Sequence, residues 1–243
     1  MSKSTTAEEK KYFQKTIGEI VTDDYRSAAV FEKHGIDFCC GGHVSLAAAC
    51  QTKNIDIDAI QIEIETATEE PIEQNNNYTA WSLSYLVDYI VNTHHGYINR
   101  ELDKISSYVH KIADVHGENH PELTKIAIIF AKIKSDLVEH LHEEERVLFP
   151  ALKRVEALKK EGTSPDSKDV IIIKKSLEKL HNDHEEIGDA VHEIRHLANN
   201  YTVPHDGCNT YTLTYKKLNE FEDDLHKHVH LENNILFSKA KRI

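Results

Sequence analysis

Over the C-terminal two thirds of the chain, an apolar residue recurs every three or four positions, which is the period of an amphipathic α-helix. Four long runs of this pattern cover residues 82–115, 121–160, 167–199 and 210–239. The segments between the runs are short and contain proline or glycine. Because short connections make consecutive helices antiparallel, the pattern predicts an all-α protein with an up-down-up-down four-helix bundle.

The N-terminal part of the chain has shorter apolar runs, which predict several short helices rather than long ones. Between the two parts, Pro71 and three consecutive asparagines interrupt any periodicity and indicate a linker. We therefore expect a small helical domain over residues 1–70, a linker over 71–80 and the bundle over 81–243.

A histidine and a glutamate recur together at two places in the predicted bundle. The sequence H-x-H-x-E begins at His140 and again at His228, and each copy is followed by Leu-Phe. On a helix, residues four apart share a face, so His140 pairs with Glu144 and His228 pairs with Glu232. Both pairs occupy core positions of the apolar pattern, whereas the middle histidines, 142 and 230, point elsewhere.

The other two predicted helices each place one histidine in the same core phase, His94 and His184. A single buried histidine is more often a hydrogen-bonded core residue than a ligand. Four of them, one on each helix, with two matched glutamates, are typical of a metal site in a helical bundle. Four imidazoles and two carboxylates suit a pair of iron or manganese ions better than one zinc ion. The predicted ligands are His94, His140, Glu144, His184, His228 and Glu232.

Composition narrows the classes of partner. The chain has 243 residues, of which 29% are charged and 40% hydrophobic, with a formal net charge of -12. An acidic chain of this kind is not expected to bind nucleic acid or an anionic membrane surface. No apolar run approaches the length of a membrane span, and the first residues do not resemble a secretory signal. A cytoplasmic location is expected.

Two adjacent cysteines, Cys39 and Cys40, precede Gly41 and Gly42 in a predicted turn. Cysteine is often only a small buried apolar residue. Two neighbouring thiols beside two glycines favour a reactive role, since a disulfide between adjacent residues is strained and glycine lets a partner approach the backbone closely. We expect these thiolates to engage iron, a persulfide, nitric oxide or a thiol of a partner.

Together these motifs resemble a known family. The bundle is similar to the hemerythrin-like di-iron fold, and the Asp37-Phe38-Cys39-Cys40-Gly41-Gly42 segment resembles the small helical domain that precedes it in iron–sulfur cluster repair di-iron proteins. The resemblance implies two iron ions per chain, bridging roles for Glu144 and Glu232, and functional roles for Cys39 and Cys40. Two ferric ions carry about +6 and two glutamates return about -2, so the charge balance favours an oxo or hydroxo bridge, or an anionic exogenous ligand. The resemblance further implies that the partners are damaged iron–sulfur proteins and that the protein repairs them after nitrosative or oxidative stress, by donating iron or by removing nitric oxide.

Two other functions stay open at this point. One is a nitric oxide-reducing enzyme at the di-iron site, and the other is a sensor of dioxygen or nitric oxide, or an iron store. Oxygen-carrying hemerythrins place a further histidine where this chain has Gly188, so reversible oxygen carriage is not expected. His181 is a less favoured substitute for that ligand, Asp136 and Asp183 are candidates to orient the ligands, and a homodimer is an open alternative.

Overall fold

The computed structural model describes residues 12–39, 41–69 and 77–242, and every named element within these residues is helical. The chain divides into two compact units, one formed by Met1–Ser82 with His230–Ser238 and the other by Leu83–Val229 with Lys239–Ile243. Two features of this division differ from the expected boundaries: the first unit extends through the expected linker to Ser82, and it includes the stretch His230–Ser238 of the last long helix. Residues 70–76 of the expected linker lie outside the described residues.

The first unit consists of short helices, each begun by a capping side chain or a tight turn. Its α-helices are α1 (Ile17–Asp23), α2 (Ala28–Lys33), α3 (Leu46–Lys53) and α4 (Ile57–Ala67), with 3₁₀ turns η2 (Tyr25–Ser27) and η4 (Tyr78–Ala80). Thr16 and Glu19 form a reciprocal capping box at the start of α1. The core of the unit contains fully buried Phe31, Leu46 and Ile60. These apolar residues come from separate short helices, so the unit depends on their mutual packing.

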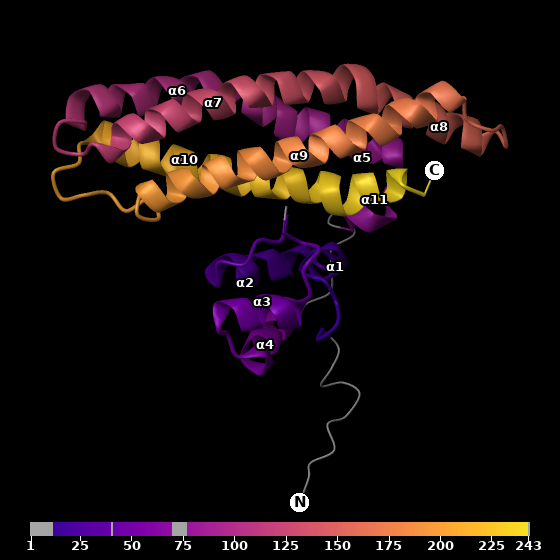
Figure 1. Ribbon diagram of the computed structural model, residues 1–243, viewed down its shortest axis with the longest axis horizontal. Helices are drawn as coiled ribbons and strands as arrows, with labels where there is room; N and C mark the ends of the chain where they lie inside the picture. Colours follow the sequence, from indigo (N-terminus) through magenta and orange to yellow (C-terminus); the bar gives the residue numbers. More distant parts are fainter. Residues whose placement is uncertain (1–11, 40, 70–76, 243) are drawn as a thin grey trace, which may run out of the picture. The chain divides into compact units, whose positions relative to one another are not determined.

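The second unit contains the long helices of the bundle, except for His230–Ser238 of the fourth helix, which group with the first unit (Figure 1). The first is α5 (Leu83–Ile90), η5 (Val91–His95) and α6 (Gly96–His116); the second is α7 (Glu122–Glu143), η6 (Glu144–Leu148) and α8 (Phe149–Lys160). The third is α9 (Ser167–Leu197), and the fourth is α10 (Asn209–His230), which continues through η7 (Leu231–Leu236) into α11 (Phe237–Ala240). These bounds agree with the predicted runs to within a few residues.

Consecutive helices pack against one another, with α6 along α7 and α7 along α9 (Figure 1). The apolar stripe of each helix forms the core, in which Ile126, Phe130 and Ile133 of α7 are buried. None of the helices in the described part of the chain is both long and apolar enough to cross a membrane.

Three of the four long helices contain a π-helical turn, at η5, η6 and η7. In a π turn the backbone hydrogen bond spans five residues instead of four, so the turn takes in an extra residue and shifts the face of the residues that follow. Such turns are frequent at functional sites. All three contain or adjoin residues of the predicted histidine–glutamate set.

Candidate metal centre

The structure brings histidines and glutamates together in two buried groups of four. One group is His95, Glu144, His228 and Glu232, and the other is His140, Glu144, His184 and Glu232. Within each group the ligand atoms all lie within 4.8 Å of one another. Glu144 and Glu232 belong to both groups, so the two groups share their carboxylates and differ in their pairs of imidazoles.

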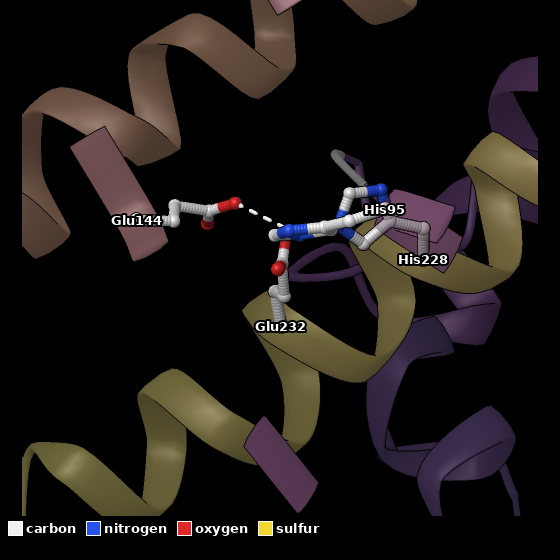
Figure 2. Close-up of side chains that lie close together, drawn as sticks. All are labelled: His95, Glu144, His228 and Glu232. Carbon is white, nitrogen blue, oxygen red and sulfur yellow. Dashed lines mark ion pairs between the residues drawn. The ribbon is translucent and has the colours of Figure 1, made fainter. Parts of the chain in front are cut away.

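The four side chains of the first group point toward one another (Figure 2). Glu144 begins the π turn η6, and Glu232 lies one turn after His228 on the continuous fourth helix. Oε2 of Glu144 lies 3.4 Å from Nε2 of His95 and 3.4 Å from Nε2 of His140. Glu144 therefore lies between an imidazole of one group and an imidazole of the other.

Burial makes this arrangement costly without a cation. Glu144 is 0% exposed, and neither of its carboxylate oxygens accepts a hydrogen bond from any described residue. A buried carboxylate left in this way carries a large desolvation penalty. A positive ion between the imidazoles and the carboxylates would remove the penalty, because it accepts the lone pairs that no hydrogen bond satisfies. The donor set and its burial thus fit a metal ion.

Carboxylates outside the two groups orient the histidine rings. Nδ1 of His95 lies 2.8 Å from Oε1 of Glu145, and Nδ1 of His140 lies 3.5 Å from Oδ2 of Asp183. A proton held on Nδ1 leaves the Nε2 lone pair directed at the centre, which is the usual arrangement for metal-binding histidines. The hydrogen bond from His140 also lowers the pKa of the Asp183 carboxyl below its ordinary value. Asp183 therefore has the orienting position expected for it, whereas Asp136 pairs with Lys132 at 3.4 Å.

One predicted ligand, His94, is not part of either group, and its neighbour His95 takes the expected place. Nδ1 of His94 lies 3.0 Å from Oδ1 of Asp224, and its ring stacks parallel to that of His228 with centroids 5.6 Å apart. The reason is the π turn η5, which ends at His95 and moves the inward direction along by one residue. A regular helical period selects His94, and the only signal for His95 in the sequence is that the two histidines are adjacent.

The remaining histidines have different environments. His142 is exposed, as its phase predicts. His230 lies outside both groups but is 0% exposed, and its ring packs against those of Tyr25 and Phe38 within the first unit. His181 is exposed and faces Glu185 at 3.8 Å, so it does not supply a ligand to either group.

Cys39 is a buried thiol in the turn that follows α2. Its Sγ lies 3.2 Å from Oδ1 of Asp37, and its backbone N–H donates to the same oxygen at 2.8 Å. Within this unit the side-chain amide of Asn233 donates to the Cys39 carbonyl at 3.3 Å, and that of Asn234 donates to the Phe38 carbonyl at 3.1 Å. Cys40 lies outside the described residues.

Comparison with known proteins agrees with this site. Residues 86–240 match the hemerythrin HHE cation binding domain, and residues 13–68 match a domain of unknown function, ScdA_N (DUF542). The bundle with its histidines and glutamates is thus a cation-binding domain of the hemerythrin class.

The order of the two domains identifies the family more closely. The chain belongs to the family of iron–sulfur cluster repair proteins. It is 34% identical to iron–sulfur cluster repair protein ScdA of Staphylococcus haemolyticus over 92% of this chain and 96% of the relative. It is 33% identical to ScdA of Staphylococcus epidermidis with the same coverage, and 30% identical to iron–sulfur cluster repair protein YtfE of Escherichia coli over 94% of this chain and 97% of the relative. The resemblance inferred from the motifs and the all-α fold are confirmed.

Proposed function

We propose that this protein repairs iron–sulfur centres of damaged proteins and that it uses two iron ions to do so. The observation that carries the proposal is that Glu144 and Glu232 belong to both buried groups. Two carboxylates common to two pairs of imidazoles suit two ions side by side, each with its own histidines. The relatives' names supply the repair role, and the fit of the residues to a cation supports the metal.

In this proposal His95 and His228 would hold one iron ion, and His140 and His184 would hold the other. Glu144 and Glu232, which belong to both groups, would be the carboxylate ligands common to the two ions. Two ferric ions carry about +6 while the two carboxylates return about -2, so an oxide or hydroxide bridge would supply further negative charge. A bound iron pair would supply Lewis-acid and ligand-exchange chemistry at this position.

The chain's own residues hold this centre and keep water from it. Glu145 and Asp183 fix the orientation of two ligand rings, and the full burial of Glu144 keeps solvent from competing for the bridging position. Cys39 and Cys40 would supply soft thiolate ligands for iron or persulfide transfer to a client protein.

Metal analysis tests the centre directly. Protein purified from iron-fed cells should hold two iron ions per chain and show near-ultraviolet charge-transfer bands of a bridged pair. A fully loaded preparation with a single ion per chain would contradict the shared-carboxylate arrangement.

A second experiment tests the repair role. The Cys39→Ser/Cys40→Ser variant should keep the iron and its optical spectrum but lose most of its ability to restore an iron–sulfur dehydratase damaged by nitric oxide. Cys208→Ser is the matched control, because this exposed thiol lies outside the cysteine turn. If the double variant restores the dehydratase as well as the parent does, the cysteine turn has only a structural role.

A further inference from the structure

A third group of ligand-type side chains lies outside the dinuclear centre. His192 on α9 and Glu222 and His226 on α10 each offer a ligand atom within 4.8 Å of the others. We propose that these three residues form a separate mononuclear site for one divalent transition-metal ion.

The geometry of this group repeats that of the main centre. Glu222 and His226 are four residues apart on one helix, so they share a face, as His228 and Glu232 do. Nε2 of His226 lies 3.8 Å from Oε1 of Glu222. The ring of His192 approaches from the neighbouring helix, with its centroid 5.6 Å from that of His226. A small inward movement of these side chains would bring all three donors to bonding distance of one ion.

Two further side chains hold the carboxylate of Glu222 in place. Nε of Arg195 donates to its Oε1 at 2.7 Å, and the hydroxyl of Tyr201 donates to its Oε2 at 2.6 Å. Ligating carboxylates are themselves commonly hydrogen-bonded, which fixes their orientation. The charge of Arg195 opposes a cation: burial acts to lower the Arg195 pKa, but the hydrogen bond with Glu222 and the charge of its carboxylate outweigh burial and raise that pKa above its ordinary value, with a smaller contribution from Asp223. The carboxylate of Asp223 adds a second negative charge to the neighbourhood.

The donor types define the class of ion. Two imidazoles and one carboxylate suit Zn²⁺, Co²⁺ or Fe²⁺ and do not suit Ca²⁺ or Mg²⁺, which prefer oxygen ligands. Three protein ligands also leave a coordination position open for water or an exchanging ligand. Glu222 is 0% exposed and His226 is 8% exposed, whereas His192 is not buried, so an ion here would be shielded on the side of α10 and accessible from the side of His192.

The site lies on two of the four long helices that supply the dinuclear centre. His192 follows His184 by eight residues on α9, and Glu222–His226 precede His228 and Glu232 on the fourth helix. At about 1.5 Å of rise per residue, both separations place the third ion on the order of 10 Å from the pair. The role of the site follows from the proposed repair function: it would hold a single iron ion that is about to enter or leave the dinuclear centre.

A cobalt titration of the iron-loaded, full-length protein tests the site. The parent should bind one Co²⁺ per chain, with visible d–d absorption, and its iron content should not change after gel filtration. His192→Ala and His226→Ala should each weaken cobalt binding by at least about tenfold while the optical bands of the iron pair persist. His196→Ala, an exposed histidine on the same helix α9, is the control and should bind cobalt like the parent.

Three results would overturn the proposal. The first is that the parent binds no additional cobalt, and the second is that the added cobalt displaces iron from the dinuclear centre. The third is that His192→Ala binds cobalt as tightly as the parent. His192→Ala is the decisive variant because His226 is part of the buried core and its replacement also tests folding. If the proposed dinuclear centre is wrong, the iron content of the parent will be below two ions per chain. This result is independent of cobalt binding, so it can be told apart from failure of the third site.

Discussion

The Nε2 atoms of His140 and His184 lie 3.0 Å apart in the buried centre of the bundle. At this separation either one nitrogen donates a proton to the other, or both direct lone pairs at a cation. Nδ1 of His140 faces the carboxylate of Asp183, which favours a proton on Nδ1 and leaves Nε2 without one. Oε2 of Glu144, 3.4 Å from the same Nε2, adds a negative group at this point. The relationship is therefore that of two ligands prepared for a metal ion.

Separate substitutions of the adjacent histidines, His94 and His95, distinguish the proposed iron ligand from its neighbour. We expect His95→Gln to lower iron affinity at least about tenfold, since one imidazole of the first group is lost. His94→Gln should keep both iron ions, because His94 contacts Asp224 and is not in either group. Iron content by mass spectrometry after dialysis against a weak chelator measures both. Equal iron loss in the two variants would contradict the claim that the π turn η5 directs His95, and not His94, at the metal.

Replacing Glu144 should change stability in opposite directions with and without metal. In the metal-free protein, Glu144→Gln removes a buried charge whose oxygens accept no hydrogen bond from the described residues, so the variant should be more stable by about 1–3 kcal/mol. In the iron-loaded protein the same variant loses a bridging ligand and should melt at a lower temperature than the parent. Thermal unfolding with and without a chelator measures the change of sign. If the variant is less stable than the parent in both states, Glu144 stabilises the fold even without metal.

Cys208 should react as a thiolate near neutral pH. Its Sγ lies 3.2 Å from Nε2 of His116, and this hydrogen bond is the main cause that lowers the Cys208 pKa to about 7. Alkylation by iodoacetamide should therefore rise with pH to half its maximum near pH 7, because only the thiolate reacts. His116→Gln should move that midpoint to higher pH. Cys50 is the internal control, since burial raises its pKa and shields it from the reagent. If the Cys208 midpoint is unchanged in His116→Gln, the imidazole does not cause the lowered Cys208 pKa.

Gly18 should not tolerate a side chain. A Cβ at this position would lie 2.6 Å from Oδ1 of Asn234 and 3.0 Å from the carbonyl oxygen of Gly42, so Asn234 would have to move away from the Phe38 carbonyl. We expect Gly18→Ala to destabilise the first unit by about 1–3 kcal/mol. Among the described residues, a Cβ at Gly96 would have the Val91 carbonyl oxygen as its one close neighbour, at 3.7 Å, so Gly96→Ala should be neutral or stabilising by up to about 1 kcal/mol. Denaturant unfolding monitored by circular dichroism compares the two. A neutral Gly18→Ala would show that the contact with Asn234 relaxes easily.

The apolar period and the histidine spacing determined most of what was expected of this protein. They predicted the bounds of the long helices to within a few residues, because an amphipathic face that must be buried repeats with the helical period. Five of the six predicted ligands lie together in the structure, His140, Glu144, His184, His228 and Glu232, since each lies in core phase on its own helix. The paired domains were also visible from motifs alone.

Tertiary structure decided what depends on a local change of helix geometry or on contacts between helices. The π turn η5 places His95, and not His94, in the buried group with Glu144, His228 and Glu232, and a hydrophobic period reports only the average helical turn. The burial of His230 depends on Tyr25 and Phe38, which lie about 200 positions earlier in the sequence. The group of His192, Glu222 and His226 likewise joins two helices, and spacing along one helix cannot show which residues a neighbouring helix brings beside it.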